Sequence, residues 1–131
     1  MTPTPPRVLV VAGSDPSGGA GLEADQRVLA MHGCYAMTAT TALTVQNTRG
    51  VTDVHVTPPA FLRKQLSSVL EDIKVDVVKI GMLACRESVE VVGDVLEKWK
   101  GEGKEVVLDP VGKWWEDGRQ ELMSTVGYGL D

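Results

Sequence analysis

Several features that mark particular classes of protein are scarce in this sequence of 131 residues. The chain has two cysteines, Cys34 and Cys85, which fit no metal-ligand spacing and make no disulfide framework. Because both have apolar surroundings in the sequence, we expect them to be reduced, buried and inert, as in a cytoplasmic protein.

Long runs of one kind of residue are also missing. The net charge is −5 and there is no long run of Lys or Arg, which argues against a nucleic acid or a membrane surface as partner. No apolar run is long enough to span a membrane. The first residues, "MTPTPP", lack the basic and then apolar build of a signal peptide. We therefore expect residues 1–6 to form a disordered lead and the protein to be cytoplasmic.

The sequence does contain an alternation of short apolar runs and amphipathic segments. The apolar runs are continuous and β-branched, which is typical of strands buried on both faces. The segments expected as strands are residues 7–13, 34–47, 51–56, 75–82 and 104–110. The segments expected as helices are residues 21–33, 57–72 and 86–103. Such alternation predicts an α/β fold, in which crossover helices cover a mostly parallel sheet.

The three helical segments carry apolar stripes and end signals. Gly33 is a natural stop for the first helix, and Thr57 is the expected N-cap of the second, ahead of two prolines. The stripe expected on the first helix is Leu22, Val28, Leu29 and Met31. The apolar face expected on the second is Phe61, Leu62, Leu66, Val69 and Leu70. The third is expected to face inward with Val89, Val92, Val95, Leu96 and Trp99.

Polar residues and glycines gather where the expected strands end. In open α/β sheets, ligands bind beyond the carboxyl ends of the strands. Those ends here are residues 13–15, 46–48, 81–82 and 109–111. Any one of them could be ordinary turn chemistry, because Gly, Asp, Asn and Pro end strands in any protein. Four together on one rim favour a small-molecule site.

The first of these ends opens a glycine-rich loop, "AGSDPSGGAG", at residues 12–21. The loop lacks the GK[ST] ending of a P-loop and the G-x-G-x-x-G pattern, and Asp15 and Pro16 intrude where a pyrophosphate would approach. Nucleotide binding by this loop alone is therefore not expected. Its glycines still let the backbone come close to a ligand at a helix N-terminus. Asp25 follows one turn into that helix, either to reach a ligand hydroxyl or as an ordinary first-turn acid.

Four separated motifs together carry a family resemblance. They are "AGSDPSGGAGLEAD", "TALTVQNTRGV", "VKIGML" and "VVLDPV". In this order and spacing, from about Val8 to Val111, the chain resembles the hydroxymethylpyrimidine/phosphomethylpyrimidine kinases of thiamine biosynthesis, in the ribokinase-like superfamily. The resemblance implies part of a three-layer α/β sandwich. It also implies phosphorylation of 4-amino-5-hydroxymethyl-2-methylpyrimidine and then of its monophosphate, with ATP and Mg²⁺.

The same resemblance implies roles for individual residues. The glycine loop would line the pyrimidine pocket rather than the ATP site. Gln46 would read the pyrimidine edge, since a carboxamide offers both a donor and an acceptor. Asp109 would help to place Mg²⁺ and the phosphates, although it could simply cap a strand end. The residues expected at the pyrimidine are Gly13, Asp25, Gln46, Met82 and Val111. Met82 could equally be plain core.

The resemblance stops after Val111. We interpret residues 7–111 as the N-terminal half of a kinase domain and residues 112–131 as an unrelated tail that supplies no anion hole, catalytic base or adenine pocket. The fragment is therefore expected to contain no catalytic residue, to be inactive alone, and to leave a sheet edge bare, which favours a homo-oligomer. Two alternatives stay open: a pyridoxal kinase-like enzyme, against which "QNTRGV" argues, and a non-catalytic pyrimidine-binding or interaction module.

Overall fold

The computed structural model describes residues 4–109 and residue 111. The predicted tail at residues 112–131 therefore lies outside the described residues, as do the first three residues of the predicted lead. Residues 4–6 are exposed and have no secondary structure, and the carbonyl of Pro6 accepts a hydrogen bond from the N–H of Tyr35 at 2.8 Å.

A parallel sheet forms the middle of the molecule, as the sequence predicts. Its strands are β1 (Arg7–Ala12), β2 (Tyr35–Thr40), β5 (Val77–Ile80) and β6 (Glu105–Leu108). They lie in the order β2-β1-β5-β6, and every neighbouring pair is parallel. Because parallel strands all point one way, their carboxyl ends share one rim, where the polar strand ends were expected to meet.

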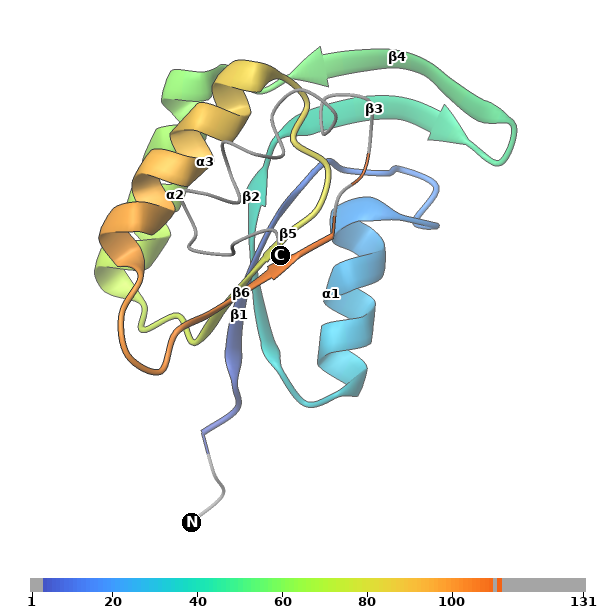
Figure 1. Cartoon of the computed structure of the whole chain (residues 1–131). Coiled ribbons are helices and arrows are strands. Elements are labelled where there is room, and N and C mark those ends of the chain that lie inside the picture. Colours follow the sequence, from blue (N-terminus) through green and yellow to red (C-terminus); the bar gives the residue numbers. More distant parts are fainter. Residues whose placement is uncertain (1–3, 110, 112–131) are drawn as a thin grey trace, which may run out of the picture.

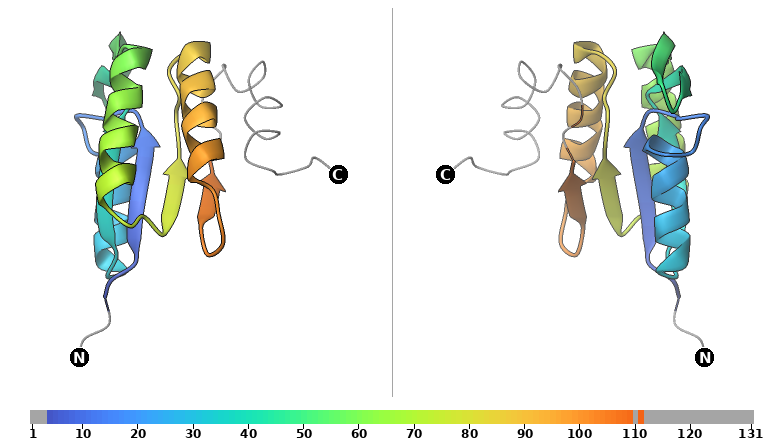
Figure 2. Two further views of the ribbon diagram at one scale, coloured as in Figure 1. Left: turned by 90° about the vertical axis from the view of Figure 1, so that its left-hand side faces the viewer. Right: turned by 90° about the vertical axis from the view of Figure 1, so that its right-hand side faces the viewer.

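Helices cover both faces of this sheet and make three layers (Figures 1 and 2). The helix α1 (Gly21–Met31) lies on one face, and the helices α2 (Pro59–Asp72) and α3 (Arg86–Trp99) lie on the other. The predicted three-layer α/β architecture is therefore confirmed. Among the described residues, no helix combines the length and apolarity that crossing a membrane requires.

The core is divided unequally between the two faces because side chains alternate along each strand. On the face under α2 and α3, the large cluster includes Leu9, Val11, Leu62, Ile80 and all five residues expected on α3. On the face under α1, the cluster contains only Val8, Val10, Ala12 and Leu22, with three partly buried neighbours. The α1 face is therefore thinly covered.

The single strand expected at residues 34–47 is wrong. It is two strands, β2 and β3 (Ala42–Asn47), and β3 pairs with antiparallel β4 (Gly50–Val56) in a separate two-stranded sheet. The break falls at Thr41, which is fully buried. Its N–H donates to the carbonyl of Ala12 at 2.9 Å, and its hydroxyl donates to the carbonyl of Met82 at 2.7 Å. These bonds turn the chain out of the parallel sheet.

Two helix details also differ from expectation. On α1, Val28 is 54% exposed and Met31 is 87% exposed, because α1 packs over β1 and β2 while no described helix covers β5 and β6 on that face. On α2, Phe61 is 58% exposed, because the side of the helix that packs inward carries Leu62 and Leu66, and Phe61 points away from that side.

The expected cap and the expected burial of the cysteines are corrected as well. The N-cap position of α2 is Pro58, and no side chain caps this end, so Thr57 is not the N-cap. The backbone N–H of Thr57 instead donates to the carbonyl of Thr41 at 3.0 Å. This bond fixes Thr57 ahead of the first residue of α2. Cys34 and Cys85 are free thiols, as expected, but both are half-buried rather than buried.

Candidate functional site

A cavity of about 230 Å³ lies at the carboxyl ends of the strands. It is bounded by the glycine-rich loop, the start of α1, the β3–β4 hairpin and the segment after β5. Its lining residues are Gly13, Ser14, Asp15, Ala20, Gly21, Thr44, Gln46, Val51, Met82 and Val111. The structure thus brings together four of the five residues expected at a pyrimidine, which are Gly13, Gln46, Met82 and Val111.

The glycines of the loop allow the close approach of two backbone segments. Gly21 has a φ of +60°, and a Cβ at this position would collide with the carbonyl oxygen of Gly13. That same carbonyl accepts a hydrogen bond from the N–H of Leu22 at 3.0 Å and so joins the end of β1 to the first turn of α1. A Cβ at Gly13 would meet the end of the Met82 side chain. Met82 therefore lies directly over the Gly13 backbone.

The loop directs its own donors at Asp15, which is 3% exposed. The Asp15 carboxylate accepts hydrogen bonds from the N–H and hydroxyl of Ser17, at 2.8 and 2.7 Å, and from the N–H groups of Gly19 and Ala20, at 3.1 and 2.9 Å. The bond from the Ser17 hydroxyl contributes most to holding the pKa of Asp15 below its usual value, and the three backbone N–H bonds add to it. These amides are already occupied, so they offer no cradle to a phosphate.

Ser14 and Glu23 connect the loop to its neighbours, and neither role was expected from the sequence. The N–H of Ser14 donates to the carbonyl of Ala42 at 2.9 Å, and the hydroxyl of Thr44 donates to the carbonyl of Ser14 at the same distance. Glu23 accepts bonds from the Ser14 hydroxyl and from the N–H of Asp15. Burial opposes the charge of Glu23, but these bonds outweigh it and lower its pKa.

Gln46 lies on β3 at a register shift between Val45 and Gln46, where the pairing with β4 is irregular. Its side chain is half-buried, and its Oε1 lies 3.2 Å from the hydroxyl of Thr44. The carboxamide therefore stands in the cavity wall on the β3–β4 hairpin. Thr44 was missed at the sequence level because a threonine within a strand carries no distinctive signal.

The structure places Asp25 outside this cavity. Asp25 lines a second cavity, also of about 230 Å³, together with Val10, Val28, Leu29 and Lys79. The ammonium of Lys79 lies 2.9 Å from Oδ2 of Asp25 and 3.3 Å from Oδ2 of Asp109. Two of the predicted site residues are thus joined through a lysine that was not predicted. The available signal was a lysine inside an otherwise apolar buried run, "VVKIGM".

A family model described as phosphomethylpyrimidine kinase matches residues 15–123, which is more than half of the chain. The chain belongs to the phosphomethylpyrimidine kinase family. The match runs beyond Val111, where the resemblance read from the motifs stops.

Individual relatives are consistent with membership of this family. The chain is 55% identical over 87 residues to a chloroplastic thiamine biosynthetic bifunctional enzyme of Arabidopsis thaliana, a match covering 66% of this chain and 17% of that enzyme. The structure resembles a Clostridium difficile phosphomethylpyrimidine kinase with a TM-score of 0.79 at 36% identity, covering 90% of this chain and 53% of that one.

The structure also resembles a pyridoxal kinase of Staphylococcus aureus in complex with AMP-PCP and pyridoxal. The TM-score is 0.75 at 34% identity, and the match covers 92% of this chain and 43% of that one. These neighbours are ribokinase-like kinases, which confirms the predicted fold family. The chain spans only about half the length of these solved kinases.

The resemblance to these kinases implies ATP and Mg²⁺, for which acidic side chains would be the natural ligands. No group of three or more His, Cys, Asp or Glu side chains that could hold an ion occurs among residues 4–109 and 111. Mg²⁺ in nucleotide sites is usually held by one or two carboxylates together with the phosphates. Asp109, whose side chain is 59% exposed at the rim, fits the part of a single carboxylate ligand of that kind.

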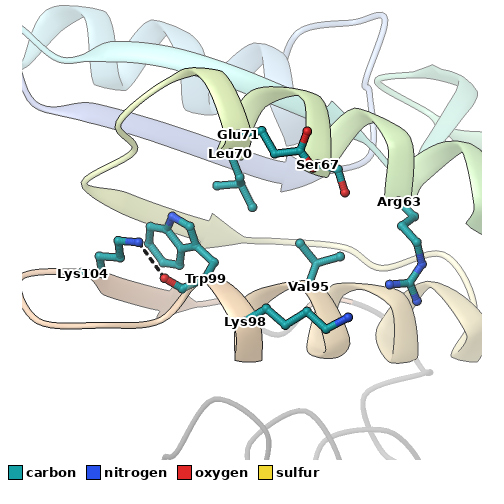
Figure 3. Close-up of a pocket in the computed structure, with 8 residues that line it drawn as sticks. All are labelled: Arg63, Ser67, Leu70, Glu71, Val95, Lys98, Trp99 and Lys104. Atoms are coloured by element: carbon teal, nitrogen blue, oxygen red, sulfur yellow. Dashed lines mark hydrogen bonds between the residues drawn. The ribbon is translucent and has the colours of Figure 1, made fainter.

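A larger cavity, of about 490 Å³, lies between α2 and α3 and contains none of the residues expected at the site (Figure 3). Several of its charged groups already have partners. Arg63 pairs with Asp94 at 2.9 Å, and Lys104 donates to the carbonyl of Trp99 at 2.7 Å with its ammonium 4.8 Å from the centre of the Trp99 ring. This groove lies on the helical layer and not at the strand ends, so it is not the candidate site for the family reaction.

Proposed function

We propose that this chain carries the acceptor-binding part of a hydroxymethylpyrimidine/phosphomethylpyrimidine kinase. The whole reaction transfers the γ-phosphoryl group of ATP to the hydroxymethyl oxygen of 4-amino-5-hydroxymethyl-2-methylpyrimidine, and then phosphorylates the monophosphate. The observation that carries the proposal is the cavity at the strand ends, where Gly13, Gln46, Met82 and Val111 meet. Membership of the family and the likeness to a solved phosphomethylpyrimidine kinase support it.

The lining of the cavity suits a small planar ring. Met82 and Val111 supply apolar surface for the faces of a pyrimidine, and the carboxamide of Gln46 can pair with a ring nitrogen and the adjacent amino group. The loop amides that would attract a phosphate are occupied by Asp15. The loop therefore favours contact with an uncharged, hydrogen-bonding ring, and its amides are not available to bind a phosphate group.

The remaining roles follow from the acids at the rim. Asp25 would address the hydroxymethyl group of the acceptor, and Asp109 would help to hold Mg²⁺, which when bound with ATP neutralises charge on the phosphates. Phosphoryl transfer relies mainly on positioning and electrostatic stabilisation. Since the chain spans 53% of the solved phosphomethylpyrimidine kinase, we propose that these 131 residues bind the acceptor but do not turn it over alone.

Calorimetric titration with the pyrimidine alcohol, together with a coupled assay for ADP, tests this proposal. Gln46→Leu should weaken binding of the alcohol by about 1–3 kcal/mol, because the ring edge loses its partners. Asn47→Leu, the same change at the next residue, is the control, since Asn47 is exposed and does not line the cavity. Equal losses in both variants, or no binding by the unaltered chain, would contradict the proposal, and ADP release above background would contradict the predicted inactivity.

Pyridoxal is the second candidate acceptor, because the solved neighbours include a pyridoxal kinase with pyridoxal bound. The motif "QNTRGV", which contains Gln46, favours the pyrimidine. Titration with both compounds separates the two, and tighter binding of pyridoxal would reverse the assignment. A non-catalytic binding module is the third candidate, and it would be supported if the longest natural form of the protein binds the pyrimidine without turnover.

We further propose that the protein is cytoplasmic and forms a homo-oligomer without nucleic acid or membrane partners. The net charge of −5 supports the absence of a nucleic acid partner. Exposed apolar residues on the β3–β4 hairpin, which include Leu43, Val45, Val51 and Val54, and Val107 on the edge strand β6 support self-association. Cell fractionation tests the location, and one relative, from Arabidopsis thaliana, is named as chloroplastic.

A further inference from the structure

Lys79 occupies an unusual position for a lysine. It lies on β5, a central strand between β1 and β6, and its side chain is only 20% exposed. Its neighbours on the strand, Val78 and Ile80, are fully buried. A buried ammonium is unfavourable unless ionised partners accept its hydrogen bonds. Lys79 therefore needs ionised partners close to its ammonium group.

The partners of Lys79 come from two other elements. Its Nζ lies 2.9 Å from Oδ2 of Asp25, on α1, and 3.3 Å from Oδ2 of Asp109, just after β6. Asp109 is itself fixed at the strand end, where its N–H donates to the carbonyl of Ile80 at 2.9 Å. One cation thus bridges two carboxylates and brings their Oδ2 atoms close together.

Gly81 provides an independent indication that this arrangement is built into the strand. A Cβ at Gly81 would lie 3.3 Å from Nζ of Lys79 and 3.0 Å from Cβ of Ala12. Both contacts are tight, and Gly81 has no positive φ that would require glycine for backbone reasons. The missing side chain therefore leaves room for the ammonium at the end of β5.

The bridge also lies next to the acceptor cavity. Asp25 follows Gly21, which lines that cavity, by four residues and so lies one turn further along the same side of α1. Asp109 comes two residues before Val111, which lines the same cavity. The two carboxylates thus flank the cavity from two different elements, and Lys79 is the contact that they share.

We propose that Lys79 is a positioning residue that fixes Asp25, on the acceptor side, relative to Asp109, on the side of the metal and phosphates. This inference rests on the proposed function, because that function assigns the two carboxylates their roles. Lys79 does not line the acceptor cavity, so it would act through the two carboxylates. It holds the Asp25 carboxylate beside the acceptor cavity, one turn of α1 beyond Gly21, from where that carboxylate would reach the hydroxymethyl group, and its positive charge offsets the repulsion between the two carboxylates.

A pair of ligands that differ by one hydroxyl tests the inference without any need for turnover. The pyrimidine alcohol and 4-amino-2,5-dimethylpyrimidine share the ring edge that Gln46 would read, but only the alcohol can bond to Asp25. Calorimetry should show that the unaltered chain binds the alcohol about tenfold more tightly, and that Lys79→Met abolishes this preference while changing the affinity for the dimethyl compound little. Lys79→Arg should retain most of the preference.

Arg7→Met is the matched control, because Arg7 also forms a partly buried ion pair, with Asp76 at 3.1 Å, at the opposite end of the same sheet. It should lower stability but leave the preference for the alcohol intact. If Lys79→Met does not fold, Gly81→Ala replaces it, since it keeps the lysine but crowds its ammonium, and it should reduce the preference. A folded variant at Lys79 with the full preference would overturn the inference, whereas an unaltered chain that binds neither compound would overturn the proposed function.

Discussion

At the scale of single residues, two acids, Asp15 in the glycine loop and Glu23 on α1, stabilise the fold without any ligand. Asp15 accepts four hydrogen bonds within the loop, and Glu23 joins the loop to α1. Such bonds favour the ionised carboxyl, which is why the pKa values of both groups lie below their usual range. Folding and the protonation of these two acids are therefore linked.

We expect the chain to lose stability in acid, and Asp15→Asn to show why. A carboxyl with a lowered pKa in the folded state contributes stability above its unfolded pKa, about 3.8 for Asp15, and the contribution is lost as the pH falls through the lower folded value. The variant should be less stable than the unaltered chain at neutral pH, and its deficit should shrink below about pH 4. Urea unfolding across this range measures both.

Glu97→Gln, at an exposed acid of α3, is the control for this experiment and should unfold like the unaltered chain at each pH. A deficit of Asp15→Asn that stays constant with pH would show that the loss comes from altered packing and not from the carboxylate.

At the scale of elements, the start of α1 depends on one backbone conformation. Gly21 has a φ of +60°, and its missing Cβ admits the carbonyl of Gly13. Gly33, just after the same helix, has a φ of +70° but has nothing within 4 Å of a Cβ. The two glycines bracket one helix and share the left-handed conformation, but only the first has a close neighbour.

Alanine substitutions at Gly33 and Gly21 distinguish the cost of backbone strain from the cost of a steric clash. Gly33→Ala should lower the free energy of unfolding by about 1–2 kcal/mol, the penalty of a left-handed residue with a Cβ. Gly21→Ala should lower it by at least about 1 kcal/mol more, because the Gly13 carbonyl must also move. Denaturant unfolding measures the difference, and equal losses would mean that the contact between the loop and the helix does not hold.

The elements also show what the sequence could predict. The alternation of apolar runs and amphipathic segments predicted the parallel strands and the three helices, because strands buried on both faces give continuous apolar runs in the sequence. The break at Thr41 was missed because residues 34–47 favour a strand throughout, and only a buried set of bonds to Ala12 and Met82 turns the chain. The exposure of Val28 and Met31 on α1 was missed for a different reason. The apolar pattern of a helix does not reveal that the helix covers only half of the sheet face on which it lies.

The candidate site was predictable to a similar degree. The rule that ligands bind at the carboxyl ends of strands, together with the family motifs, selected Gly13, Gln46, Met82 and Val111, which the structure gathers in one cavity. The rule could not show that Asp25 lies in the neighbouring cavity with Lys79. That pairing joins residues 54 positions apart, and it depends on how α1 packs over β1, the strand next to β5.

At the scale of the whole molecule, the coverage of the sheet is unequal. The helices α2 and α3 bury the larger core, whereas on the other face α1 packs over β1 and β2. Among the described residues, β6 pairs with one strand only, and Val107 on it is 51% exposed. An edge strand with an exposed apolar residue is a site at which other chains can pair.

We expect the purified chain to self-associate through this edge and to be only marginally stable. Val107→Lys should shift the chain toward a monomer, because a charge on an edge strand opposes pairing with a second copy. Met31→Lys is the control, since Met31 is 87% exposed on α1 and does not lie on the edge. Sedimentation velocity measures the change, and an unaltered chain that is a monodisperse monomer with a sharp melt would refute the expectation.

Ser14 has a consequence for the thermodynamics of ligand binding. Its N–H and carbonyl bond to the hairpin, and its hydroxyl bonds to Glu23 on α1, so one residue ties together the loop, the hairpin and the helix that surround the cavity. A wall that is already assembled needs no ordering when a ligand enters. The conformational entropy of the protein should therefore change little when the ligand binds. The affinity should instead reflect how well the ring fits a preorganised cavity.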